Sequence, residues 1–116
     1  MAVEMRPAQA LRLLHDLAHA LVTDGEADLS VRQLAVLLTI YLEPPPHTVR
    51  GLAAKLRVTK AVITRALDSM GKLELVSRKR DVSDRHNVII QRTVKGALYV
   101  EELGDLFVAK AQELPR

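Results

Sequence analysis

The chain has 116 residues, 48% of them apolar, with no cysteine and only three aromatic residues; its 17 lysines and arginines exceed its 14 aspartates and glutamates by three. This composition excludes a disordered chain and predicts one globular domain over residues 1–116. The lack of cysteine excludes disulfides, thiolate metal sites and cysteine-based redox sensing. The scarcity of aromatic rings disfavours a base-stacking platform for single-stranded nucleic acid.

The chain shows no sequence feature that would place it in a membrane. Its longest nearly apolar stretch, residues 34–42, is far too short to span a bilayer. The first residues lack the basic segment followed by an apolar one that is typical of signal peptides. We therefore expect a cytoplasmic protein without a membrane partner.

Two helices are predicted in the first part of the chain. Apolar residues recur every three or four positions between Pro7 and Gly25, which predicts a helix of about 17 residues that begins near the proline and ends before the glycine. Ser30 and Gln33 form a capping-box pattern at the start of a second helix, which runs to Leu42 and ends at three prolines. The residues expected on one buried face of this helix are Leu34, Leu37, Leu38 and Tyr41.

Two shorter helices follow, and a threonine that can cap the helix precedes each of them. Thr48 precedes a helix over residues 49–56, and Thr59 precedes another over residues 60–73. Between them lies a tight turn at Arg57-Val58, where Arg57 or Val58 occupies a position at which glycine is common in such motifs. The first of these helices is too short to be stable alone, so the pair is expected to pack as a helix-turn-helix. The residues expected to hold the two helices together are Leu52, Ala53, Ala54, Leu56, Val58, Ile63 and Ala66.

A β-hairpin and a last helix complete the predicted order. Residues 75–79 and 87–92 are rich in valine and isoleucine and predict two strands joined by a charged tip. Thr93 is then expected to cap a helix that runs to about residue 114. The predicted fold is therefore mainly α with a small β-hairpin wing, and residues 48–92 form a winged helix-turn-helix.

Positive charge is concentrated in this winged segment. Residues 50–92 contain 11 basic and four acidic residues, a net charge of +7, whereas the rest of the chain contains six basic and ten acidic residues, a net charge of −4. A basic surface confined to one motif is what binding to a phosphate backbone requires. An ordinary solvated basic face is the other reading of the same count.

The second helix of the helix-turn-helix is expected to present its outward face to the major groove of DNA. Lys60 and Arg65 can reach phosphates or guanine edges, and Thr64 can donate a hydrogen bond or contact a thymine methyl group. Ala61 can also face a methyl group. Asp68 lies farther along the helix, where we expect it to orient a basic neighbour.

The predicted hairpin carries basic residues before and within its tip. A protruding arginine such as Arg85 can enter the narrow minor groove, where negative potential is concentrated. Acidic residues beside it repel phosphate unless they orient arginine side chains by ion pairing, and we assign this role to Asp84. The predicted wing contacts are Arg78, Lys79, Arg80, Arg85 and His86.

The segment LSVRQLAVLLTI, which begins at Leu29, is followed by TVRGLAAKLRVTKAVITRALDSM, which begins at Thr48, and by the tip DVSDRH over residues 81–86. In these segments residues 29–96 resemble the MarR family of bacterial winged-helix regulators. The tip is similar to the family's Asp-x-x-Asp-Arg-Arg, and residues 93–96 are similar to its Leu-Thr-x-x-Gly. The resemblance implies a homodimer on pseudo-palindromic promoter DNA, with a recognition helix in each major groove and Arg85 in the minor groove. The major-groove residues that it implies are Thr59, Lys60, Ala61, Thr64 and Arg65.

The chain departs from the family pattern in three ways. His86 replaces the second arginine of the tip, so we expect a wing that binds less tightly or responds to pH. Glu74 stands where glycine commonly precedes the wing, which is expected to alter the helix end. One C-terminal helix is predicted where longer members have two, so residues 5–25 and 94–114 are expected to form the dimer interface.

A metal site and an enzyme active site are two other possibilities for this sequence. His15 and His19 are spaced i, i+4 on the first helix and could bind one metal, although two partly exposed residues beside a leucine stripe are the simpler interpretation. We therefore predict no metal and no other cofactor, and a small-molecule effector is left open. The sequence has no cysteine nucleophile, glycine-rich phosphate loop or persuasive carboxylate constellation, so we do not expect an enzyme.

The sequence thus predicts a transcriptional regulator that binds specific double-stranded DNA on the nucleoid, as a homodimer and as a repressor that occupies a promoter. The alternative is a winged-helix interaction module that binds an acidic protein partner through the same basic face. Salt-dependent DNA binding with sequence preference would distinguish the regulator from the module.

Overall fold

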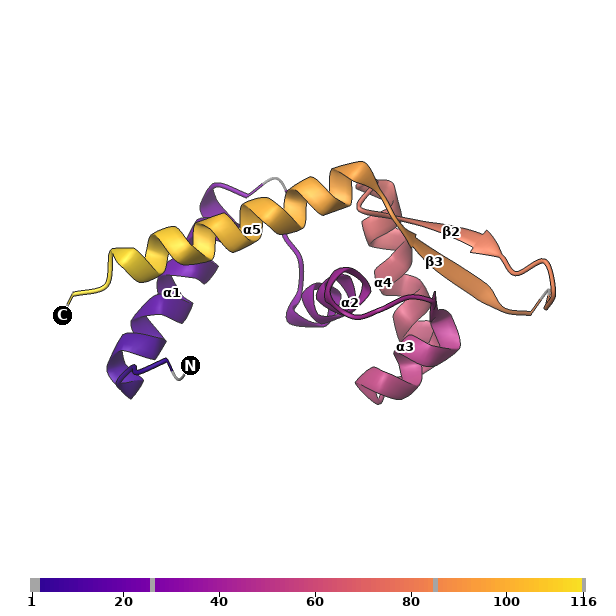
Figure 1. Cartoon of the computed structure of the whole chain (residues 1–116), viewed down its shortest axis with the longest axis horizontal. Coiled ribbons are helices and arrows are strands. Elements are labelled where there is room, and N and C mark those ends of the chain that lie inside the picture. Colours follow the sequence, from indigo (N-terminus) through magenta and orange to yellow (C-terminus); the bar gives the residue numbers. More distant parts are fainter. Residues whose placement is uncertain (1–2, 26, 85, 116) are drawn as a thin grey trace. The chain divides into compact units, whose positions relative to one another are not determined.

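The computed structural model of the protein describes residues 3–25, 27–84 and 86–115 (Figure 1). It has the predicted fold, which is mainly α with a small antiparallel sheet. Among the described helices, none is both long and apolar enough to cross a membrane. The elements in chain order are α1 (Pro7–Thr23), α2 (Val31–Leu42), β1 (His47–Thr48), α3 (Val49–Leu56), α4 (Lys60–Lys72), β2 (Val76–Arg80), β3 (Val88–Arg92) and α5 (Val94–Gln112).

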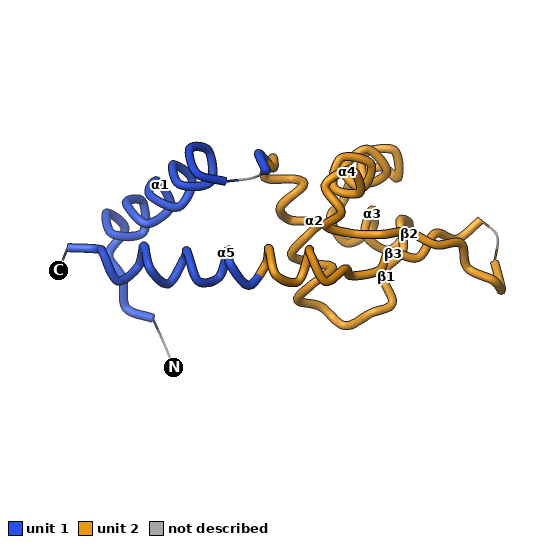
Figure 2. The backbone as a smooth tube through the Cα atoms, turned by 90° about the horizontal axis from the view of Figure 1, so that it is seen from above, with its two compact units in different colours: residues 1–28, 101–116 blue, residues 29–100 orange. Residues whose placement is uncertain are grey.

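The chain divides into two compact units, which Figure 2 shows in different colours. One unit, residues 29–100, contains α2, α3, α4, the sheet and the beginning of α5. The other consists of residues 1–28 and 101–116 and contains α1 and the rest of α5.

The helix starts are where the sequence predicts them. The Ser30 hydroxyl accepts from the Gln33 N–H at 3.1 Å, and the Gln33 side-chain oxygen accepts from the Ser30 N–H at 2.7 Å, which completes the capping box of α2. The Thr48 and Thr59 hydroxyls accept from backbone N–H groups three residues on, at 2.9 and 3.2 Å. These caps satisfy N–H groups that have no partner within the helix.

The core of the larger unit corrects two of the packing predictions. In α2 the fully buried side chains are Val36, Leu37 and Ile40, so the buried face is rotated away from Leu34 and Leu38, which are only half-buried. In α3 Ala53 is buried but Ala54 is exposed, so one alanine rather than two lies where the helices cross. The reason is that α2 and α3 each meet several elements at once, and contact with those elements decides which side of a largely apolar helix is buried. The inner face of α4 is buried as predicted, at Ile63, Ala66, Leu67 and Met70.

The sheet has a third strand that the sequence did not predict. Its order is β1-β3-β2, with His47 opposite Ile90 and Val76 opposite Arg92. The β1 strand contains only two residues, too few to show an alternating pattern. The two predicted strands are present, but β2 is shifted by one residue, to Val76–Arg80, and β3 begins at Val88.

The turns that end α3 and α4 each contain a residue in the left-handed conformation, and neither residue is glycine. Arg57 has φ 57° and Glu74 has φ 61°. After each of them, a backbone N–H bonds back into the preceding helix, from Val58 to the Ala53 carbonyl and from Leu75 to the Met70 carbonyl, both at 3.0 Å. This closure usually employs glycine, because a side chain in this conformation costs roughly 1–2 kcal/mol. We expected Glu74 to alter the end of α4, but it preserves the backbone turn there.

Both ends of the β2–β3 hairpin are bound to the C-terminal part of α2. The Tyr41 hydroxyl donates to the Leu75 carbonyl at 2.6 Å and accepts from the Thr93 N–H at 3.0 Å. The Arg92 guanidinium donates to the Ile40 carbonyl at 2.8 Å and to the Glu43 carbonyl at 2.9 Å. The Arg92 bonds satisfy carbonyl groups at the end of α2, and all four bonds together fix the base of the wing next to α4.

Candidate nucleic-acid interface

The exposed side of α4 carries the residues predicted to contact the major groove. Its inner face is anchored in the core, while Thr59 caps its N-terminus. The Arg65 side chain folds back along the helix, where its Nε–H donates to the Ala61 carbonyl at 3.4 Å. The structure therefore places all five predicted residues on the solvent side of the helix: Thr59, Lys60, Ala61, Thr64 and Arg65.

The wing is tied to α4 by an ion pair. Arg78 Nη1 lies 2.8 Å from Asp68 Oδ1, so Asp68 orients a basic neighbour as the sequence predicts, and that neighbour comes from β2. Both side chains are substantially exposed, and such pairs contribute about 0–1 kcal/mol, so the value of this pair lies in orientation. Lys79 follows on the opposite face of the strand, and Arg80 returns to the face of Arg78.

The wing tip is ordered by carboxylates. Asp81 accepts from the Ser83 hydroxyl at 2.7 Å, from the Ser83 N–H at 3.0 Å and from the Asn87 side-chain amide at 3.3 Å. The hydrogen bond from the Ser83 hydroxyl, with those from the Ser83 N–H and the Asn87 amide, lowers the pKa of the Asp81 carboxyl below its ordinary value. The Asp84 carboxylate accepts from the His86 N–H at 3.0 Å. Asp84 thus orders the tip backbone, whereas its predicted ion pair with Arg85 lies outside the described residues.

Most of the basic side chains in this region have no carboxylate partner. Within residues 50–84 and 86–92, only Lys55 and Arg78 form ion pairs, with Glu43 and Asp68 respectively. The positive charge predicted from the sequence count therefore remains available to a polyanion. The basic residues that have no ion pair in this part of the chain are Arg50, Arg57, Lys60, Arg65, Lys72, Lys79, Arg80 and Arg92.

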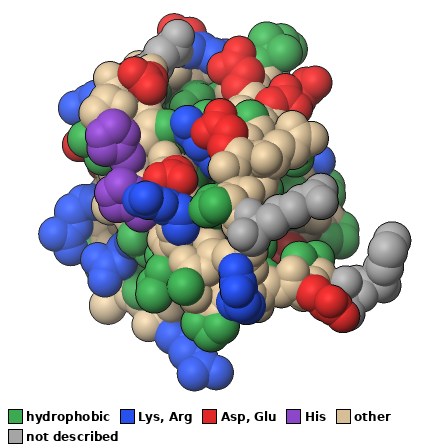
Figure 3. All heavy atoms as spheres, turned by 90° about the vertical axis from the view of Figure 1, so that its left-hand side faces the viewer, with side chains coloured by type: hydrophobic (Ala, Val, Ile, Leu, Met, Phe, Trp, Pro, Cys, Tyr) green, Lys and Arg blue, Asp and Glu red, His purple; other side chains and the backbone are tan. Residues whose placement is uncertain are grey.

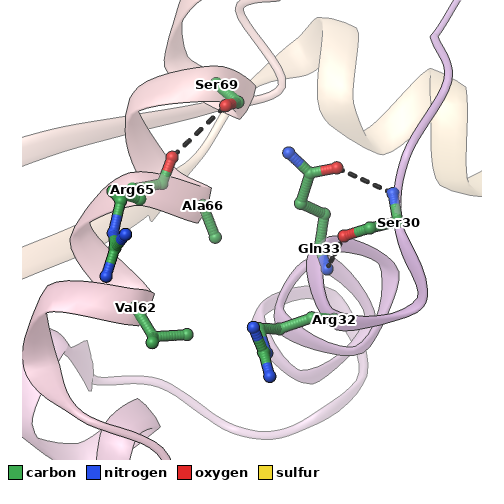
Figure 4. A pocket seen from close by; sticks show the side chains of 7 residues that line it. All are labelled: Ser30, Arg32, Gln33, Val62, Arg65, Ala66 and Ser69. Carbon is green, nitrogen blue, oxygen red and sulfur yellow. Dashed lines mark hydrogen bonds between the residues drawn. The ribbon is translucent and has the colours of Figure 1, made fainter.

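A groove with a volume of about 320 Å³ lies between α2 and α4 (Figure 4). Arg32 from α2 and Arg65 from α4 stand on its two sides. Arg32 is not among the residues that the sequence predicts to contact DNA, because it precedes the basic segment of residues 50–92. The one sequence feature that indicates a role for Arg32 is its position two residues after the N-cap Ser30, at the start of α2. The other residues that line the groove are Ser30, Gln33, Val62, Ala66 and Ser69.

A family model describes this arrangement of helix-turn-helix and wing. The model of the MarR family matches residues 29–88, which is more than half of the chain. The chain belongs to the MarR family. It is therefore a DNA-binding transcription regulator with a winged helix, and not an enzyme. No curated protein is a significant match to its sequence.

Solved structures with the same fold include known regulators. A mutant of MepR from S. aureus, bound to an oligodeoxyribonucleotide, has a TM-score of 0.76 at 20% identity and covers 94% of this chain and 81% of its own. YusO from Bacillus subtilis has a TM-score of 0.74 at 20% identity, and the match covers 88% of this chain and 70% of YusO. The transcriptional repressor CouR, bound to a DNA duplex, has a TM-score of 0.72 at 24% identity, and the match covers 91% of this chain and 72% of CouR. The likeness is one of fold.

The two histidines of α1 form a surface pair in this MarR-family protein. The rings of His15 and His19 stack with their centroids 5.9 Å apart, and His15 Nδ1 lies 3.1 Å from the Asp16 carboxylate. Two neighbouring histidine side chains are visible in Figure 3. Across the described parts of the chain, no three histidine, aspartate or glutamate side chains are grouped so that they could hold a metal ion. The pair supplies two nitrogen donors on an exposed helix face.

Proposed function

We propose that the protein is a homodimeric repressor that acts in the cytoplasm by occupying a pseudo-palindromic promoter site on the nucleoid. The observation that carries the proposal is the exposed face of α4, where Lys60 and Arg65 lack carboxylate partners beside a wing that carries further cations. MepR and CouR, two structural relatives, were solved with DNA, and CouR is a repressor. Repression requires only occupancy of the promoter, without a contact to polymerase.

We assign the major-groove contacts to the exposed side of α4 and the minor-groove contact to Arg85 at the wing tip. Arg78, Lys79, Arg80 and His86 are assigned to the wing surface, and Arg78 is aligned there by Asp68. A dimer would present its two recognition helices about one DNA turn, roughly 34 Å, apart. A protein-interaction module would use the same basic face, and the family match does not favour it.

Arg65→Ala is expected to weaken binding to the operator and to relax base preference, because Arg65 can read a base edge. Arg85→Ala is expected to weaken binding to all duplexes alike, because the wing reads mainly groove shape and charge. The losses should correspond to about 1–3 kcal/mol each. Bound fragments are first selected from genomic DNA to identify the operator. Titration of the parent and both variants on the selected duplex and on an unrelated duplex then measures the loss of affinity and the loss of base preference. Parent-like affinity in both variants would contradict the assignment.

The dimerisation proposal is supported by apolar side chains that a single chain leaves exposed. On α1, Leu11 is 68% exposed and Leu14 is 62% exposed, although both belong to the apolar residues that recur every three or four positions in this helix. The residues buried in α1 are Leu13 and Ala20. On α5, Phe107 and Val108 are about half exposed, and only Gly96 is buried among the described residues of that helix. Exposed apolar faces of this kind are typical of surfaces that associate.

Leu14→Glu is expected to convert the dimer into a monomer, because a carboxylate would be buried in the proposed interface without a partner. Sedimentation equilibrium without DNA measures the change at micromolar protein concentration. Leu42→Glu is the matched control, since Leu42 is 72% exposed and lies outside the helices assigned to the interface. If the parent is itself a monomer at this concentration, the dimer proposal is wrong. If Leu14→Glu dimerises as the control does, α1 does not form the interface.

A further inference from the structure

We propose that the groove between α2 and α4 binds a phosphodiester group of duplex DNA, with Arg32 as a backbone contact outside the helix-turn-helix and wing. This inference rests on the proposed function, because it assumes that α4 enters the major groove. It extends the DNA-binding surface to the N-terminal turn of α2, a part of the chain outside residues 48–92.

The chemistry of the groove favours an anionic oxygen ligand. Both Arg32 and Arg65 line the groove; in Figure 4 Arg32 lies on the α2 side, and the Arg65 side chain runs along α4. No ion pair among the described residues includes either of them, and no carboxylate from the described part of the chain lines the groove. The Gln33 oxygen is engaged by the Ser30 N–H, so its amide nitrogen is left to donate. The groove therefore combines two cations with a neutral donor, which suits a phosphate oxygen.

The position of the groove favours DNA as the source of that phosphate. Along α4, Val62, Arg65 and Ser69 border the groove, whereas Asp68 borders the wing through its ion pair with Arg78. The exposed face of α4 thus has the groove on one edge and the wing on the other. The major groove is roughly 12 Å wide and is bordered by a phosphate backbone on each side. A helix that occupies it brings one backbone to the wing and the other to the α2–α4 groove.

The test is a salt titration of DNA binding by the full chain and its Arg32→Ala variant, on the selected operator and on an unrelated duplex. Loss of a phosphate contact is expected to weaken binding to both duplexes by the same factor. It should also reduce the slope of log K against log salt concentration by about 0.9 for each contact. Arg32→Lys keeps the charge and is expected to retain most of the slope. Lys55→Ala, at an exposed α3 lysine that is paired with Glu43 and is assigned neither to a DNA contact nor to the dimer interface, is the control for removing one charge.

Two results would overturn the inference. The first is a slope for Arg32→Ala equal to that of the parent while the parent binds DNA, which leaves the proposed function intact. If inorganic phosphate inhibits DNA binding by the parent but not by this variant, the groove binds a free anion instead. The second is an equal loss of slope in Lys55→Ala, which would show an effect of net charge alone. A parent that shows no salt-dependent DNA binding would instead refute the proposed function, and this inference with it.

Discussion

Gly96→Ala is expected to lower the free energy of unfolding by about 3 kcal/mol. A Cβ atom at this position would overlap the Tyr41 hydroxyl and the Leu75 carbonyl and would lie 2.7 Å from Tyr41 Cζ. Tyr41 cannot move aside without breaking its hydrogen bonds to the Leu75 carbonyl and the Thr93 N–H. Because these bonds hold both ends of the wing on α2, the substitution is also expected to loosen the wing.

Urea denaturation followed by circular dichroism measures this loss, and α5 provides its own control. A Cβ at Gly104 would have no atom within 4 Å among those described, apart from the helix backbone around it. Gly104→Ala is therefore expected to stabilise the protein by roughly 0.5–1 kcal/mol, as alanine does in a helix interior. Opposite signs for the two substitutions would support the close packing at Gly96. A Gly96→Ala variant as stable as the parent would show that Tyr41 is not held as described.

Leu67→Ala is expected to cost about 3 kcal/mol, within the range of roughly 2–5 kcal/mol for leucine truncated in a core. Leu67 is fully buried on the inner face of α4, in one cluster with Leu37, Ile40 and Met70. The loss has two parts, the transfer of the removed atoms to water and the cavity left in a core that cannot fully collapse. The exposed face of α4 is unchanged, so protein that remains folded is expected to bind DNA with nearly the parent affinity.

The matched control for this prediction is Leu42→Ala. Leu42 is 72% exposed at the end of α2, and its truncation is expected to change the free energy of unfolding by no more than about 0.5 kcal/mol. Urea titrations of both variants, together with DNA binding under conditions where both are folded, separate stability from recognition. Equal stability of the two variants would contradict the packing of α4. If the folded Leu67→Ala variant loses DNA affinity, packing in the core also sets the orientation of α4.

The position of α4 is fixed by contacts that lie outside its exposed face. Arg57 and Glu74 supply the left-handed turns before and after α4, and both accept the strain that glycine would avoid. Arg92 and Tyr41 bind the hairpin ends to α2, so the wing stands at a fixed place beside α4. Such a scaffold orders the interface before DNA arrives and thereby lowers the entropy lost on binding.

Local signals in the sequence were sufficient to predict the helices and their first residues. Ser30, Thr48 and Thr59 were identified as caps, and each forms the predicted hydrogen bond within its own first turn. The period of the apolar residues likewise predicted the inner face of α4, and so left its outward residues as candidates for DNA contact. These features depend on groups three or four residues apart, whose relative positions are set by helix geometry alone.

Features that join distant parts of the chain were decided only by the tertiary structure. The pairing of His47 with Ile90 creates a strand without a pattern of its own, and the rotation of α2 buries Val36 instead of Leu38. The groove is lined by both Arg32 and Arg65, which are 33 positions apart, and so extends the basic surface beyond the helix-turn-helix and wing. Charge and periodicity identify which residues can bind DNA, but they contain no information about which side chains from separate helices face one another. That choice follows from how all the apolar faces are buried together, and it determines which cations lie beside α4.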